Sequence, residues 1–209
     1  TFRRDASVFG VGGFCPSKPM NKQGVVAIYR GIESARATVP LRLFFSHKYA
    51  VSSVHFPDET HVLSASTDVH YHLLSQTHSD QPLLVLKHDD YTNSVTSVNE
   101  QLMVTGCADH YVRVWDLRQK PVRSVRSWKM DSAVRSVSVL SSNGSGKVVG
   151  AGDGISVWDI GYEEVIWGGD EVNCVSCRGD SIIAGSLDGS VRVWDANNGH
   201  LRFEKTFEK

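Results

Sequence analysis

The sequence has few cysteines and no long apolar run. Four cysteines, Cys15, Cys107, Cys174 and Cys177, are too few and too unevenly spaced for a disulfide framework, which favours a reducing compartment. The longest apolar stretches, such as Leu83–Leu86, fall far short of the roughly 20 apolar residues that span a bilayer. We therefore expect no membrane partner and a location in the cytoplasm or nucleus.

An excess of charge of either sign is also missing. Lys and Arg number 22 and Asp and Glu 23, for a formal net charge of −1, so nothing draws the whole chain to phosphate backbones. A nucleic-acid partner is not expected. With 41% hydrophobic and 22% charged residues in a length of 209, the chain has the composition of one globular domain.

A repeated motif dominates the second half of the chain. Val112–Asp116, Ser156–Asp159 and Val191–Asp195 each end in Trp-Asp, at intervals of roughly 40 residues. Small residues and then an acid precede each of them. These acids are Asp109, Asp153 and Asp188.

Two weaker units precede these three. Ser64–Asp68 has the same shape, and counting from Asp68 puts Leu74 and Ser75 at the places of the Trp-Asp pair. Gln23–Arg30 fits more loosely, with Tyr29 at the place of the Trp. We therefore expect a single domain over 1–209, made of a divergent unit at 1–45, recognisable repeats at 46–199 and a closing strand at 200–209.

Each unit reads as short strands separated by turns. Val134–Val139 alternates apolar and polar residues, Gly, Asn, Asp and Ser fill the turns, and nothing indicates a long helix. Four strands in about 40 to 45 residues, with Trp-Asp ending the third, is the pattern of a propeller blade. The predicted fold class is all-β.

From about Phe45 to Asp195 the chain resembles the WD40 family. The resemblance implies a β-propeller with about five four-stranded blades visible, and we expect an excerpt of a seven-bladed ring. In that family a His, a Ser or Thr, an Asp and a Trp of each blade form a buried hydrogen-bonded set. The matching set here is His88, Thr105, Asp109 and Trp115, and partial sets comprise His47, Ser64, Asp68, Asp153, Trp158, Asp188 and Trp194.

Two groups of residues could suggest a metal. Cys174 and Cys177 form a CxxC within an expected strand, where alternation places the sulfurs on opposite faces. His70, His72 and His78 lie close in sequence, but no acidic ligand is evident, and we expect imidazoles on an outer strand to be solvated. No metal and no cofactor are predicted.

No enzyme motif is present. The sequence has no Gly-x-Ser-x-Gly elbow and no HExxH, and Gly10–Gly13 lacks the spacing of a phosphate-binding loop. We therefore predict a non-catalytic scaffold that binds other proteins in a multi-subunit complex. A small-molecule ligand is not expected, and a propeller hydrolase or lyase with a central metal is the less favoured alternative.

A second alternative comes from Met103–Arg118, which ends in Trp115-Asp116-Leu117-Arg118. This stretch resembles the WDxR box of WD40 proteins that recruit substrates to cullin-type ubiquitin ligases. The resemblance implies that Arg118 docks onto an adaptor, whereas the simpler interpretation is a solvated turn residue.

Partner-binding residues are expected on the loops between blades. A turn closes with Gly, Asn, Asp or Ser, so a larger or charged residue there is available for contact. The candidates are Tyr49, His110, Arg118 and Trp128.

Overall fold

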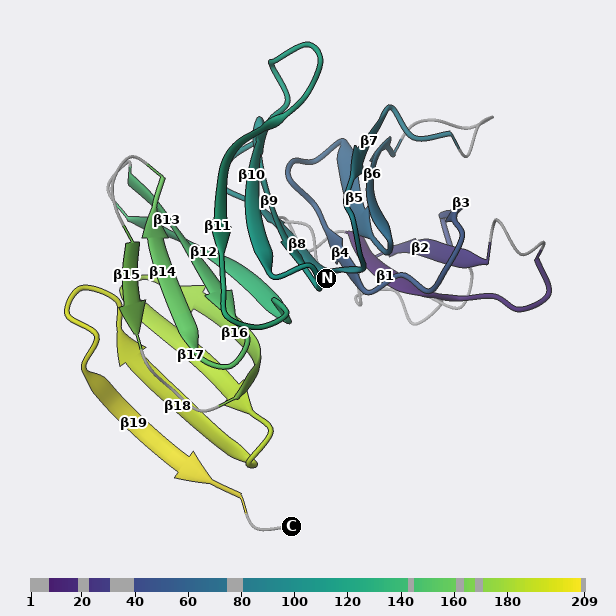
Figure 1. Cartoon of the computed structure of the whole chain (residues 1–209). Helices are drawn as coiled ribbons and strands as arrows, with labels where there is room; N and C mark the ends of the chain where they lie inside the picture. The colour runs from purple at the N-terminus through teal and green to yellow at the C-terminus, as the bar shows by residue number, and fades with distance from the viewer. Residues whose placement is uncertain are drawn as a thin grey trace. The chain divides into compact units, whose positions relative to one another are not determined.

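The computed structural model describes residues 8–18, 23–30, 40–74, 81–142, 145–160, 164–167 and 171–207 (Figure 1). Within these residues all regular structure is β-strand, and no helix is present that could cross a membrane. The strands form five antiparallel sheets. This confirms the all-β prediction and fits propeller blades. The chain divides into two compact units, Thr1–Glu100 and Gln101–Lys209, and each is described by itself.

The first unit contains two sheets and a further strand. One sheet has the order β1-β2-β3 and the other β4-β5-β6-β7. The Val95 amide donates to Ser53 Oγ at 3.3 Å, so strand β8 lies beside β4. The bounds are β1 Val8–Phe14, β2 Gly24–Arg30, β3 Arg42–His47, β4 Ser53–His55, β5 His61–Ala65, β6 Asp68–Leu73, β7 Leu84–Lys87 and β8 Thr92–Ser97.

The second unit repeats the antiparallel arrangement. Strand β10 pairs with β9 on one side and β11 on the other, and two four-stranded sheets follow in chain order. Strand β19, expected as the closing strand, pairs with β18. The bounds are β9 Leu102–Cys107, β10 Tyr111–Asp116, β11 Ser124–Lys129, β12 Ser136–Ser142, β13 Ser145–Ala151, β14 Ile155–Asp159, β15 Glu164–Trp167, β16 Val172–Arg178, β17 Ser181–Ser186, β18 Ser190–Asp195 and β19 Leu201–Thr206.

The first sheet departs from the expected four strands. Only β1, β2 and β3 belong to it among the described residues. Phe9 on β1 stacks on Tyr29 on β2, with ring centroids 5.2 Å apart. The described residues before β4 therefore form a three-stranded sheet that ends at His47.

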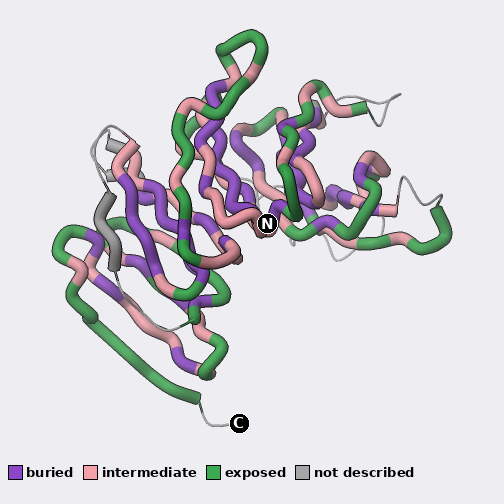
Figure 2. The backbone as a smooth tube through the Cα atoms, viewed as in Figure 1, coloured by how far each residue is buried: buried purple, intermediate pink, exposed green. Residues whose placement is uncertain are grey.

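Buried side chains gather between successive sheets of each unit (Figure 2). In the first unit the cluster consists of Val26, Ile28, Phe44, Val51, Phe56 and Val62. In the second unit it includes Leu140, Val149, Ile155, Val157, Val175, Ile182 and Trp194. Alternate residues of each strand supply these side chains because a strand presents its two faces in turn. Strand β19 contributes nothing to these clusters, because all of its residues are exposed.

The strand register corrects one alignment made from the sequence. Three residues separate Ala65 from its partner Val69, whereas five separate Gly106 from its partner Val112. Because this turn is two residues shorter, the residue that takes the Trp place of the repeat is His72. Leu74 was therefore the wrong match, and Ser75 lies outside the described residues. Trp115 pairs with Met103 just as His72 pairs with Val62.

Candidate functional site

The Trp of the third repeat is held by a hydrogen bond inside the second unit. The Trp115 indole N–H donates to Thr105 Oγ1 at 3.0 Å, and both side chains are buried. Asp109 accepts from the Tyr111 amide at 3.0 Å and forms an ion pair with Arg113 at 2.7 Å, which fixes the turn between β9 and β10. His88 Nδ1 donates to the Leu86 carbonyl at 3.0 Å, which turns this ring towards its own strand.

The next two repeats lack the acceptor. Gly150 stands where Thr105 stands in the third repeat, and the buried Trp158 indole N–H has no hydrogen-bond partner among the described residues. A Cβ at Gly150 would lie 2.8 Å from Trp158 Cζ3, so the indole itself requires glycine. Ala184 has the same place opposite Trp194.

The turn acids of these two repeats bind locally. The Asp153 amide donates to Ser132 Oγ at 2.8 Å, and its carboxylate lies 3.6 Å from Arg135. Asp188 accepts from the Ser190 amide at 2.7 Å and pairs with Arg192 at 2.9 Å. Both acids therefore stabilise turns, and each also pairs with an arginine that contacts a glutamate.

A larger polar cluster lies in the first unit, around Asp68. His47 contacts Asp68 Oδ1 through Nδ1 at 3.2 Å and Ser64 Oγ through Nε2 at 2.7 Å. A carboxylate only accepts, so His47 Nδ1 carries the proton and Nε2 accepts from the Ser64 hydroxyl. Burial, the largest influence, lowers the pKa of His47, and Asp68 opposes this shift only in part. His47 is therefore neutral at pH 7.

Two further histidines extend this cluster. His70 Nε2 lies 3.3 Å from Asp68 Oδ1, and His70 Nδ1 lies 2.9 Å from Ser46 Oγ. Ser46 Oγ in turn lies 3.0 Å from His72 Nε2. The donors and acceptors balance if His72 donates to Ser46, Ser46 donates to His70, and His70 donates to Asp68.

Burial acts in opposite directions on His72 and Asp68 of this cluster. Burial lowers the pKa of His72 to about 3, with smaller contributions from His70, His47 and Arg42. Burial raises the pKa of Asp68, but hydrogen bonds from His47 and His70 outweigh it and hold that pKa well below its usual value. Near neutral pH His72 is therefore neutral and Asp68 carries a negative charge.

These positions correct the expectation of solvated imidazoles. His70 is 6% exposed and His72 is fully buried, while His78 lies outside the described residues. The structure also supplies the acid that the sequence did not reveal, because ligand atoms of His47, Asp68 and His70 lie within 4.8 Å of one another. The rings of His47 and His70, however, stack with centroids 3.9 Å apart and 13° between their planes. One ion could not lie in both ring planes, so this arrangement suits hydrogen bonding.

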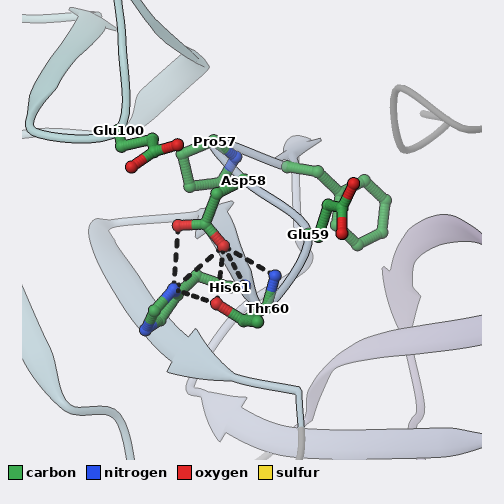
Figure 3. A pocket seen from close by; sticks show the side chains of 7 residues that line it. Pro57, Asp58, Glu59, Thr60, His61 and Glu100 are labelled. Carbon is green, nitrogen blue, oxygen red and sulfur yellow. Dashed lines mark hydrogen bonds and ion pairs between the residues drawn. The ribbon is translucent and has the colours of Figure 1, made fainter.

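A separate pocket opens beside β5 (Figure 3). It has a volume of about 440 Å³ and is lined by Phe56, Pro57, Asp58, Glu59, Thr60, His61 and Glu100. Asp58 accepts from Thr60 Oγ1 at 2.8 Å and contacts His61 Nδ1 at 2.8 Å. Burial raises the pKa of Asp58, but its hydrogen bonds with Thr60 and His61 outweigh burial and lower it. The Tyr71 ring stacks on the His61 ring, with centroids 4.6 Å apart.

Exposed aromatic residues meet on the connections that precede β4 and β8. Tyr49 and Tyr91 are each 39% exposed, with ring centroids 5.7 Å apart. Lys48 lies over the Tyr49 ring at 4.9 Å. Tyr49 was a candidate from the sequence, whereas Tyr91 was missed. Its position after His88 in the following repeat, like that of Tyr49 after His47, could have indicated it.

The other loop candidates lie in different settings. Arg118 follows β10, its side chain is 63% exposed, and it donates to Asp116 through Nε at 2.8 Å and through Nη2 at 2.6 Å. His110 is half-buried in the turn before β10 with a φ of 76°, and its carbonyl accepts from Met130 at 2.8 Å. Trp128 is not a loop residue. It lies on β11, is half-buried and stacks on Trp158 with centroids 5.3 Å apart.

The model of the WD domain, G-beta repeat, matches residues 80–116 and 165–195. These two stretches end at the Asp residues of two Trp-Asp pairs. Together with five antiparallel sheets, the match decides the family. The chain belongs to the WD40-repeat family.

Two relatives align with about three quarters of this WD40 chain and a third with about half of it. The U3 small nucleolar RNA-associated protein 15 homolog of Xenopus laevis is 30% identical over 173 residues, which cover 76% of this chain and 32% of that protein. The Gallus gallus homolog is 28% identical over 169 residues, with the same shares. Eukaryotic translation initiation factor 3 subunit I of Aspergillus terreus is 35% identical over 123 residues, or 49% of this chain and 36% of that protein. The chain thus spans about a third of the length of these relatives.

The cysteines of the WD40 repeats are all free thiols. Cys174 is exposed, and Cys177 packs against the apolar cluster of the second unit. Burial raises the pKa of Cys177 to about 11, against a smaller opposing effect of Ser138. Cys177 is therefore a protonated thiol near neutral pH.

Proposed function

We propose that this chain is a non-catalytic WD40 scaffold that binds other proteins within a multi-subunit complex. The observation that carries the proposal is the exposed pair Tyr49 and Tyr91 on equivalent connections of successive repeats. Aromatic side chains that the fold leaves half outside are the usual anchors of protein interfaces. Lys48, over the Tyr49 ring, adds a cation to the same surface.

The relatives support a role in assemblies. Two are named for association with U3 small nucleolar RNA, and a third is named as a subunit of a translation initiation factor. A nuclear location follows from the first two if the chain shares their setting. Protein contacts, without a cofactor or a bound small molecule, are the interactions that we propose for this chain.

Affinity purification from nuclear extract tests the proposal. The double variant Tyr49→Ala/Tyr91→Ala is expected to lose co-purifying proteins that the original chain retains. A matched control is Leu187→Ala/Leu201→Ala, which removes two exposed apolar side chains from the second unit. If both variants retain the same proteins as the original chain, the aromatic pair is not the interaction site.

A second candidate function is substrate recruitment to a cullin-type ubiquitin ligase through Trp115–Arg118. The supporting observation is that Asp116 holds the exposed Arg118 guanidinium with two hydrogen bonds, which orients it outward from the end of β10. Arg118→Ala should then abolish capture of the ligase adaptor, while Arg123→Ala should not. Equal capture by both variants would remove this candidate.

A further inference from the structure

An exposed run of cations follows the Trp-Asp pair of the third repeat. We call Lys120, Arg123, Arg126 and Lys129 the basic edge. All four are exposed, and the sequence contains no Asp or Glu between Asp116 and Asp131. Most other arginines of the second unit pair with a carboxylate, as Arg113 does with Asp109.

The four cations of the basic edge have no such partner among the described residues. Arg126 donates only to the Val125 carbonyl, at 3.4 Å. This leaves four positive charges that the described part of the second unit does not neutralise. An exposed cation without an ion-pair partner costs little free energy because water solvates it, but four such cations in one short segment give a local positive potential.

The same segment includes the edge strand of a sheet. Strand β11 is the outermost strand, paired only with β10, and Figure 2 shows it largely exposed. The Met130 amide donates inward to the His110 carbonyl at 2.8 Å. Because inward and outward groups alternate along an antiparallel strand, the backbone N–H and C=O of Ser127 and Lys129 point away from β10. These groups are available to another strand.

Packing of Trp128 also anchors the strand that carries part of the basic edge. Trp128 stacks on Trp158 of β14 with 11° between the ring planes, and Trp158 is fully buried. Anchoring of this kind reduces the ordering that a partner would have to impose.

We infer that the basic edge binds an extended acidic segment of a partner protein, which adds to β11 as a further strand. The inference rests on the proposed scaffold function and names the chemistry of one partner. Main-chain hydrogen bonds to Ser127 and Lys129 supply part of the affinity, and carboxylates beside Arg126 and Lys129 supply selectivity. The same charges repel a second copy of β11, so the edge discriminates against self-pairing.

An acidic peptide fits this edge better than single-stranded RNA does. RNA-binding surfaces without sequence preference combine cations with aromatic rings on which bases stack. The aromatic residue of this strand, Trp128, already stacks on Trp158. The chain as a whole, with a formal net charge of −1, adds no general attraction to phosphates.

Fluorescence anisotropy with a labelled peptide in which pairs of Glu alternate with pairs of Thr tests the inference, because such a strand carries carboxylates on both faces. Arg126→Glu/Lys129→Glu should weaken binding by about tenfold or more, since two attractive charges become repulsive. The matched control Arg178→Glu/Lys205→Glu makes the same change in net charge at two exposed cations of the same unit. It should bind within about twofold of the original chain.

Strand addition, unlike general charge attraction, requires main-chain hydrogen bonds. Ser127→Pro keeps every cation but removes an outward N–H, and it should weaken peptide binding severalfold. If this variant fails to fold, a peptide N-methylated at alternate residues makes the same test on the original chain. N-methylation should then weaken binding.

Three results would overturn the inference. They are equal loss in the two double variants, no effect of N-methylation, and binding of a labelled oligouridylate in preference to the peptide. None of these affects the scaffold proposal, which is tested separately by the Tyr49 and Tyr91 variant. Loss of co-purifying proteins in that variant, with no peptide binding at the basic edge, would refute this inference alone.

Discussion

The Trp115 indole N–H donates to Thr105 at 3.0 Å, whereas the equivalent N–H of Trp158 finds no acceptor in the part of the chain that the structure describes. Both indoles are buried. One sequence difference, Thr at 105 against Gly at 150, separates a satisfied polar group from an unsatisfied one. The repeats are therefore alike in fold but unequal in how their polar groups are paired.

The first prediction follows from this contrast. Thr105→Val keeps the shape of the side chain but removes the hydroxyl that accepts from the Trp115 N–H, and it should reduce the free energy of unfolding by about 1 to 3 kcal/mol. Chemical denaturation followed by Trp fluorescence measures the change. Thr96→Val, at a half-buried threonine of β8, is the comparison and should cost less. If Thr105→Val leaves the free energy of unfolding unchanged, the hydrogen bond contributes nothing to stability.

The second prediction concerns the missing acceptor at Gly150. A serine there would offer an oxygen to Trp158, yet its Cβ would lie 2.8 Å from the Trp158 ring and 3.0 Å from Met130 Sδ. Crowding of a packed core costs about 1 to 3 kcal/mol, so Gly150→Ser should destabilise the second unit. Thermal melts check this. Higher stability in the variant would mean that the ring can move aside.

The third prediction concerns pH and the histidine cluster. His72 has a folded pKa of about 3, far below the usual value of 6.5, and His47 is lowered as well. Below pH 6.5 these histidines bind protons in the unfolded chain but not in the folded chain. The free energy of unfolding is therefore highest above this pH and falls as pH decreases towards 3. The slope for one such group is at most about 1.4 kcal/mol per pH unit.

Thermal melts between pH 7.5 and pH 5 are the measurement, in roughly half-unit steps. His72→Phe should flatten the profile of the first unit, because Phe44 already packs on this ring at 4.6 Å and accepts an aromatic neighbour. His200→Phe, at an exposed histidine of the second unit, is the control and should leave the profile unchanged. An unaltered slope in His72→Phe would exclude His72 as the source.

The fourth prediction concerns the cysteines of β16. Iodoacetamide at pH 8 should modify the exposed Cys174 well before Cys177, whose pKa burial raises to about 11. Peptide mass spectrometry measures the two rates. Elemental analysis after dialysis should find no stoichiometric zinc. Equal rates, a Cys174–Cys177 disulfide or one zinc per chain would contradict the expectation.

The sequence predicted what depends on local pattern. Alternation and the Trp-Asp repeats gave the all-β fold, and Trp158 and Trp194 lie in the strands where the repeat placed them. Residue counting failed where a turn changed length. Leu74 was matched to the Trp place by counting from Asp68, but the turn between Ala65 and Val69 is two residues shorter than the turn between Gly106 and Val112.

Long-range contacts were also beyond the sequence. His47 ends β3, whereas Asp68 and His70 lie on β6, so their convergence required the fold. Trp128 was assigned to a loop, whereas it lies within strand β11, Ser124–Lys129. Its partner Trp158 lies in a different repeat, which sequence spacing does not reveal.

The turns between the middle strands of the repeats obey a rule of parity. Three residues lie between the closing partners Ala65 and Val69 and between Ala151 and Ile155, and five lie between Gly106 and Val112 and between Gly185 and Val191. Side chains alternate along a strand, so a change of two residues returns each one to its own face, whereas a change of one would turn the core outward. Such a repeat can lengthen or shorten at this turn only in even steps.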